Sequence, residues 1–273
     1  MKKLVAILLS LMLILAVVFS VSADALSDLQ AKGKIVVGVS VGYPPYEFYY
    51  TNPESGKEEM AGFDIALAYG IGEKLGLDVE IADQTFAGLI TALQAGEIDL
   101  IISGMVAKPE RKEVIDFSKP YYAATQIMMM TEEKANTLKT VEDMTGKKVG
   151  AQMGALQVDI LEEQFSNAEP YIIDNVNVLV LDLVQGNIDG LLLADLVAKQ
   201  YITAYKDSVP LVISDVPVVY NSNGASIGVA KGDNESLIQA LDAYIDEVKA
   251  DGTFDSWVDT AAAQAASLLE PAE

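Results

Sequence analysis

The segment that decides the fold spans residues 93–122 and reads LQAGEIDLIISGMVAKPERKEVIDFSKPYY. Within it, Gly96 is placed to end a helix. The strongly apolar run 98–102 (IDLII) is typical of a short strand buried on both faces. That strand ends at residues 103–105 (SGM), where small residues allow backbone N–H groups to face open space. Arg111 follows in a polar loop. Free amides at a strand tip beside an arginine predict a site for a small anion such as a carboxylate.

Taken alone, an arginine between Glu110 and Lys112 is more often a solvated surface charge than a ligand contact, because arginine side chains are mostly exposed. The order of the whole segment changes that balance. It resembles the signature of the amino-acid-type extracytoplasmic solute-binding proteins, the soluble receptors of ABC importers (bacterial solute-binding protein family 3). Their pattern runs G-x-x-D, an apolar strand, G-[ML]-[ST]-x-[ST]-x-E-R and D-F-[ST]-x-P-Y, and nearly every fixed position occurs here in that order.

The resemblance covers residues 35–257 and implies an α/β fold, a two-lobed periplasmic-binding-protein clamp in which each lobe is a mixed, mainly parallel sheet flanked by helices. It divides the chain into a signal peptide (1–23), a first part of lobe 1 (24–124), lobe 2 (125–215), and a return to lobe 1 with C-terminal helices (216–273). Two crossings near residues 123–126 and 215–224 are expected to form a hinge that closes on the ligand. No role is predicted for the alanine-rich tail.

The order of segments along the chain independently indicates an α/β fold. Strands are expected at residues 35–39, 79–81 and 98–102, with helical apolar spacing between them, which is the order of a parallel sheet flanked by helices. The second half repeats this order, since residues 146–150 (GKKVG) and 186–189 (GNID) echo the G-K and G-x-I-D elements of the first half. Each echo is weak by itself, but the same order in both halves predicts two lobes of similar design.

The N-terminus carries the pattern of a secretory signal peptide. Lys2 and Lys3 precede an uncharged apolar run at residues 4–19, and cleavage is expected after Ala23 or Ala25. An uncleaved anchor is the alternative, because about 20 apolar residues can span a bilayer. The chain has no cysteine, which excludes disulfides and a lipid anchor on an N-terminal cysteine. We therefore expect a protein that is secreted across the cytoplasmic membrane and free in the periplasm.

Composition narrows the function classes further. The formal net charge of −22 argues against nucleic acid or an anionic membrane surface as a partner. Histidine is absent, as cysteine is, so imidazole and thiolate groups are unavailable as catalysts or metal ligands. No catalytic residue, metal site or cofactor is predicted.

The resemblance also implies which residues bind the ligand. Arg111 falls on the arginine that pairs with the ligand α-carboxylate, and such a charged pair contributes roughly 1.5–3 kcal/mol. Tyr43 and Phe86 fall on the aromatic residues that enclose the ligand side chain, although core packing explains either of them about as well. The remaining candidates are Ser103, Gly104 and Met105 at the strand tip, Ala155 in a turn that opens a lobe 2 helix, and Asp195 as the acid for the α-ammonium.

The assignment of Asp195 departs from the family pattern. The family acid usually stands five residues after the aspartate of G-x-x-D, a position that Ala194 occupies here, whereas Asp195 stands six residues after Asp189. Either the loop is shifted by one residue or this contact is absent. A helix N-cap before Leu196 explains Asp195 equally well.

Three further departures concern polarity. Val106 and Ala155 stand where the family usually has hydroxyl side chains, and each lost hydrogen bond costs about 1 kcal/mol. Ser40 stands where members that take basic amino acids often carry an acid. A buried cation without a partner costs several kcal/mol, so we expect a neutral or modestly apolar amino acid.

The function predicted from the sequence is that of a monomeric, non-enzymatic receptor. It would bind a small amino-acid-like solute and deliver it to the membrane permease of an ABC transporter. Two alternatives remain open. One is an enzyme of the dehydratase or glycan-cleaving type on the same scaffold, which would depend on carboxylates, lysine or tyrosine. The other is the ligand-sensing domain of a signalling system.

Overall fold

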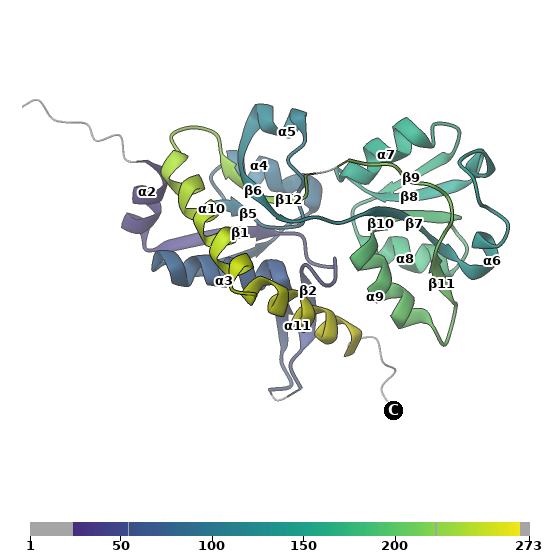
Figure 1. Ribbon diagram of the computed structural model, residues 1–273, viewed down its shortest axis with the longest axis horizontal. Helices are drawn as coiled ribbons and strands as arrows, with labels where there is room; N and C mark the ends of the chain where they lie inside the picture. The colour runs from purple at the N-terminus through teal and green to yellow at the C-terminus, as the bar shows by residue number, and fades with distance from the viewer. Residues whose placement is uncertain (1–23, 54, 222, 268–273) are drawn as a thin grey trace, which may run out of the picture.

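The computed structural model describes residues 24–53, 55–221 and 223–267, so the predicted signal peptide lies outside the described residues. Two five-stranded sheets flanked by helices form two lobes that lie side by side (Figure 1). None of the described helices is long and apolar enough to cross a membrane. The two-lobed α/β architecture expected from the sequence is confirmed.

The sheet of lobe 1 is mixed. Strand β1 is parallel to β4 and β5, whereas β12 is antiparallel to β5 and β6. In spatial order the strands are β4 (Asp78–Asp83), β1 (Lys34–Val39), β5 (Leu100–Ile101), β12 (Ala225–Ala230) and β6 (Ile115–Tyr122). The helices of this half are α2 (Ala25–Lys32), α3 (Phe63–Leu75), η1 (Phe86–Gly88), α4 (Leu89–Gln94), α5 (Pro109–Val114), α10 (Glu235–Ala250) and α11 (Thr253–Ser267). A hairpin of β2 (Phe48–Thr51) and β3 (Glu58–Ala61) completes it.

Lobe 2 repeats this plan with a contiguous part of the chain. Its strands, in spatial order, are β11 (Leu211–Ile213), β7 (Gln126–Thr131), β10 (Gly190–Ala194), β8 (Lys148–Gln152) and β9 (Glu169–Ile173). Its helices are α6 (Glu132–Ala135), η2 (Glu142–Met144), α7 (Leu156–Gln164), α8 (Val176–Val184) and α9 (Asp195–Tyr205). All five residues of β10 are buried, as expected for a central strand covered on both faces.

The repeated G-x-I-D element has a structural cause. In lobe 1 the carboxylate of Asp99 accepts the Val36 N–H at 2.7 Å, and the Asp99 N–H donates to the Val36 carbonyl at 2.7 Å. In lobe 2 Asp189 accepts the Lys148 N–H at 3.0 Å and donates its own N–H to the Lys148 carbonyl at 2.7 Å. Asp99 therefore fixes the start of β5 against the parallel strand β1, and Asp189 fixes the start of β10 against the parallel strand β8.

Three segments connect the lobes. The chain passes from β6 to β7 through residues 123–125 and from β11 to β12 through residues 214–224, near the two crossings expected from the sequence. The third segment is helix α11, which contacts α3 and β2 in lobe 1 and α9 in lobe 2 (Figure 1). Its residues Ala261 and Ala265 are buried, and their small side chains permit close packing. Rotation of the lobes about the two crossings remains a prediction.

Candidate binding pocket

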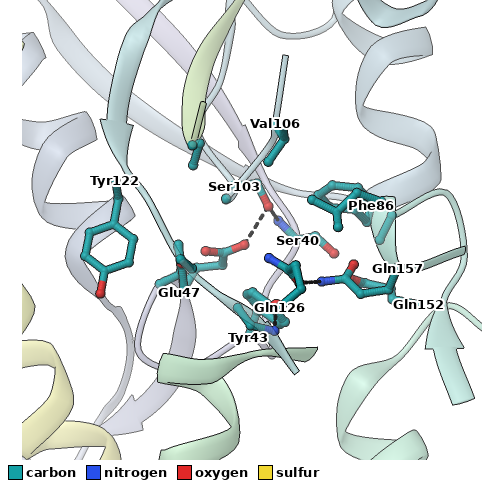
Figure 2. A pocket seen from close by; sticks show the side chains of 18 of the residues that line it. Ser40, Tyr43, Glu47, Phe86, Ser103, Val106, Tyr122, Gln126, Gln152 and Gln157 are labelled. Carbon is teal, nitrogen blue, oxygen red and sulfur yellow. Dashed lines mark hydrogen bonds between the residues drawn. The ribbon is translucent and has the colours of Figure 1, made fainter. Parts of the chain in front are cut away.

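A pocket lies between the two lobes at the ends of strands from both sheets (Figure 2). Lobe 1 lines it with polar and aromatic side chains, chiefly those of Ser40, Tyr43, Glu47, Phe86, Ser103 and Arg111. Lobe 2 contributes Gln126, Gln152, Ala155 and Gln157. Among the described residues, no group of three or more acidic side chains is arranged to hold a metal ion. The pocket is therefore built from both halves of the molecule and presents one cation.

Arg111 is held rigidly in this pocket. Its side chain is 6% exposed, and Nη1 donates to the Val106 carbonyl at 2.8 Å while Nη2 donates to the Gly154 carbonyl of lobe 2 at 2.9 Å. The guanidinium carbon lies 5.6 Å from the centre of the Phe86 ring. Burial lowers the pKa of Arg111, but a guanidinium remains charged in proteins. Within the described ranges no carboxylate oxygen lies within 4.0 Å of its nitrogens, so this buried cation has carbonyl partners and no counter-ion.

The strand tip that was expected to offer free amides has a different hydrogen-bonding arrangement. Ser103 Oγ accepts the Ser40 N–H at 3.0 Å and donates to Glu47 Oε1 at 2.5 Å. The Gly104 N–H donates to Asp64 Oδ2 at 2.7 Å instead of facing the pocket. Ser103 and Gly104 line the pocket, whereas Met105 is 1% exposed and packs in an apolar cluster with residues of α4.

Two buried acids beneath the strand tip were missed by sequence reasoning. Glu47 is 1% exposed and Asp64 is 0% exposed, and Asp64 Oδ2 also accepts the Tyr121 hydroxyl at 2.8 Å. Burial raises the pKa of Glu47 well above its ordinary value and the pKa of Asp64 to about 7. The available signal was Glu47 itself, an acid between Tyr46 and Phe48 in a proline-rich apolar turn.

Lobe 2 faces the pocket with amides, which were also not predicted. Gln157 Nε2 donates to Gln126 Oε1 at 2.8 Å, and Gln152 Nε2 donates to the Asp174 carbonyl at 3.0 Å. Ala155 lines the pocket at the start of α7, as its place in the turn suggested. These amides make the pocket polar even though positions 106 and 155 lack the hydroxyl side chains that are usual in the family.

Asp195 is placed away from this pocket lining. It is the first residue of α9, where Ala194 is the N-cap, and its Oδ1 accepts the Thr125 N–H at 3.2 Å. Its Oδ2 pairs with Lys199 Nζ at 2.7 Å. Ala194, which occupies the position of the family acid, lines the pocket. One residue later, the Asp195 carboxylate instead accepts a hydrogen bond from the 123–125 crossing.

Tyr43 and Phe86 both line the pocket. The Tyr43 hydroxyl accepts the Ala194 N–H at 3.3 Å, which joins a lobe 1 turn to the end of β10 in lobe 2. Phe86 is 9% exposed and begins η1. Six of the eight predicted residues thus meet around one pocket, and Met105 and Asp195 do not line it.

The family described as bacterial extracellular solute-binding proteins, family 3, matches residues 35–260. The chain belongs to this family. Its membership confirms the resemblance to the amino-acid-type solute-binding proteins of ABC importers, and a family 3 protein works outside the cytoplasmic membrane. The pocket between the lobes is accordingly the candidate solute site of a family 3 receptor.

Among family 3 relatives, the arginine-binding extracellular protein ArtP of Bacillus subtilis is 31% identical over 221 residues, which cover 79% of this chain and 82% of that protein. A crystal structure of the Streptococcus pneumoniae protein AbpA bound to L-arginine has a TM-score of 0.83 at 29% identity, over 89% of this chain and 99% of that one. An ancestral amino-acid-binding protein, named as a precursor of cyclohexadienyl dehydratase, has a TM-score of 0.76 at 29% identity, over 87% and 99%.

Proposed function

We propose that this receptor captures a free amino acid by pairing Arg111 with the α-carboxylate, and that it delivers the solute unchanged to the permease. The observation that carries the proposal is the buried guanidinium, which lines the pocket and has hydrogen bonds to one carbonyl from each lobe but no counter-ion among the described residues. A desolvated cation in that setting is stabilised by an anion with a planar pair of oxygens. The relatives named for arginine binding support an amino acid as the source of that anion.

The lack of enzymatic activity is part of the proposal. One structural neighbour is named as a dehydratase precursor, and that alternative is left to experiment, whereas the geometry bears on glycan cleavage. Glycan cleavage requires two carboxyl groups that flank the substrate, with room for it between them. Here Glu47 lines the pocket, whereas Asp64 is fully buried behind it and accepts from the Gly104 N–H and the Tyr121 hydroxyl. The acids are therefore stacked into the protein and do not flank a ligand. Mass spectrometry of the bound solute before and after incubation would reveal any turnover.

A second cavity bears on the ligand side chain. It shares Ser40 and Gln152 with the first pocket, and it is lined by Asp83 from lobe 1 and Asp174 from lobe 2. Burial, and then the charge of Asp83, raise the pKa of Asp174, whose Oδ1 is buried without a hydrogen-bond donor. Two carboxylates that meet between the lobes repel each other, and a ligand cation between them would relieve that repulsion.

We therefore favour a basic amino acid as the solute. The sequence-based expectation of a neutral ligand side chain rested on Ser40 and did not include this cavity. Asp83 and Asp174 lie 91 residues apart in the sequence, and only the fold brings them together. Both acids are partly solvated, so each contact with a ligand cation contributes roughly 0.2–1 kcal/mol. Arginine-binding relatives agree with this choice.

A thermal-shift panel tests the solute class. At equal millimolar concentrations, L-arginine or L-lysine is expected to raise the melting temperature more than L-glutamine or L-leucine, since a ligand at 100 times its Kd adds about 2.7 kcal/mol to stability. Asp174→Asn should reduce the arginine shift and leave the glutamine shift in place, whereas Asp78→Asn at the start of β4 is a matched exposed control. A larger shift with a neutral amino acid would contradict the basic class, and no shift with any amino acid would contradict the proposed function.

We further propose that closure of the lobes traps the solute, with Lys108 and Asp159 as a closing contact. Lys108 Nζ lies 2.5 Å from Asp159 Oδ2 across the lobes, and its side chain is 10% exposed. Neither residue lines the pocket, so the pair would stabilise the closed arrangement of the lobes without contacting the solute.

Replacing Lys108 by methionine is expected to accelerate solute release about fivefold, because a half-buried ion pair of about 1 kcal/mol is lost only from the closed state. Stopped-flow release from the parent, Lys108→Met, Asp159→Asn and the double variant gives the coupling between the two side chains. Glu110→Gln, which removes the exposed partner of Lys108 within lobe 1, is the control. Equal release rates in all variants would show that this contact does not hold the lobes closed.

The remaining features of the proposal are a monomeric state and a periplasmic location. The absence of cysteine from the printed sequence supports a location free in the periplasm, because such a lipid anchor needs that residue. The signal peptide expected at residues 1–23 lies outside the described residues. Whether it is cleaved is decided by the mass of the mature protein.

A further inference from the structure

Two carboxyl oxygens beneath the pocket have no hydrogen-bond donor in the described part of the chain. They are Glu47 Oε2 and Asp64 Oδ1, and both are fully buried. The other oxygen of each acid is satisfied, since Glu47 Oε1 accepts from Ser103 and Asp64 Oδ2 accepts from Gly104 and Tyr121. A buried carboxylate oxygen without a donor is strongly unfavourable, so these two atoms require an explanation.

The two unsatisfied groups are neighbours. The side chains of Glu47 and Asp64 are within hydrogen-bonding reach of each other, and each perturbs the ionisation of the other. Two ionised carboxylates repel at this range, whereas one proton between them converts the contact into an O–H···O bond. The same proton satisfies both orphan oxygens at once.

Among the residues that the structure describes, no cation forms an ion pair with Glu47 or Asp64. The titratable groups that face it are the hydroxyls of Tyr43 and Tyr46 from its own turn and that of Tyr121 from β6, all neutral over the working pH range. Arg111 lines the same pocket but donates to the Val106 and Gly154 carbonyls. The proton is therefore the available means of lowering the charge of the pair from −2 to −1.

We propose that Glu47 and Asp64 share one proton between Glu47 Oε2 and Asp64 Oδ1, and that this bond positions the strand tip at Ser103 and Gly104 for solute binding. The second part rests on the proposed function, because it takes the pocket as the solute site. The connection is direct: Glu47 holds the Ser103 hydroxyl, which in turn holds the Ser40 N–H, and Asp64 holds the Gly104 N–H. Loss of the proton would place two like charges under both lining residues.

The sign of the pH dependence follows from the raised values. In the unfolded chain both acids lose their protons near pH 4, whereas burial raises the pKa of Asp64 to about 7 and that of Glu47 well above normal. Above about pH 4 the folded protein then keeps at least one proton on the pair that the unfolded chain has released. The contribution of the pair to stability is complete below about pH 4 and decreases as the pH rises through the folded pKa.

The test compares melting temperatures from pH 5 to pH 9 without ligand. Glu47→Gln is the informative variant, because an amide can donate permanently to Asp64 Oδ1 while its oxygen accepts from Ser103. The parent is expected to lose at least about 4 °C more than Glu47→Gln over this range. Glu58→Gln, on exposed β3, should follow the parent. Parallel curves for the parent and Glu47→Gln would overturn the shared proton, and Asp64→Asn provides the same comparison if Glu47→Gln does not fold.

Calorimetry with L-arginine then tests the positioning role. Between pH 6 and pH 9 the affinity of the parent is expected to fall at least about threefold more than that of Glu47→Gln, a comparison that cancels the titration of the ligand's own α-ammonium. If Glu47 instead contacted the ligand cation, the affinity of the parent would rise with pH as the pair loses its proton, and Glu47→Gln would weaken binding most at high pH, which would overturn the positioning role. If the proposed function itself were wrong, no amino acid would bind, yet the melting curves without ligand would still report on the shared proton.

Discussion

Replacing Arg111 by alanine is expected to weaken solute binding by at least about 100-fold while the protein remains folded. The solute carboxylate would be left in a closed pocket without its cation, and breaking a buried charge pair on one side costs about 3–5 kcal/mol. The fold should tolerate the change, since Arg111 bonds to only two carbonyls and packs against Phe86 at the rim of the core. Titration calorimetry with L-arginine measures the loss, and circular dichroism checks the fold.

Two further variants make this result specific. Lys112→Ala removes an exposed cation one residue away and should bind as the parent does. Arg111→Lys keeps the charge but loses the planar fork, so it should recover part of the affinity and no more. If the affinity of Arg111→Ala were within about threefold of the parent, a loss of binding free energy under roughly 0.7 kcal/mol, Arg111 would not be the anchor.

The second large effect is expected at Gly62, immediately before α3. Its φ is +128°, and a Cβ atom there would lie 2.0 Å from the Tyr46 carbonyl oxygen. Backbone atoms cannot move aside as a flexible side chain can, because the Asp64 N–H donates to that same carbonyl at 3.0 Å. We expect Gly62→Ala to cost more than about 4 kcal/mol and to lower the melting temperature by at least about 8 °C.

Gly76→Ala is the matched control for this variant. Gly76 also has a positive φ, +69°, but a Cβ atom there would meet nothing within 4 Å. Its replacement should therefore cost only the backbone strain of about 1 kcal/mol. Equal melting temperatures for the two variants would show that the contact at Gly62 relaxes and that the turn above it is not rigid.

The elements that the sequence predicts best are those with a local cause. Residues 98–102 read as a buried strand because all of them except Asp99 are apolar. The structure buries Ile98 and Ile102, although the hydrogen-bonded strand covers only Leu100–Ile101. The repeated G-x-I-D elements predicted two similar lobes, and the structure gives the reason: each aspartate binds the backbone of a neighbouring strand. The position of Arg111 was available from the ordered motif around it.

The elements that escaped prediction depend on distant partners. Glu47 and Asp64 stand 17 residues apart, and nothing local indicates that both are buried or that they meet. The amides of Gln126, Gln152 and Gln157 carry no motif that marks them as facing a pocket. Asp195 was judged by its distance from Asp189 along the chain, but its direction is set by the Thr125 N–H and by Lys199.

The position of β12 sets an order of assembly during synthesis. This strand lies between β5 and β6, yet it consists of residues 225–230, which are made after the whole of lobe 2. The strands of lobe 2 all come from residues 126–213, so that lobe has every strand it needs much earlier. Because synthesis starts at the N-terminus, the sheet of lobe 1 lacks an inner strand until β12 has been made. A nascent chain that crosses a membrane therefore has an incomplete lobe 1 until its last quarter arrives. The later-made lobe is thus the first that can be completed.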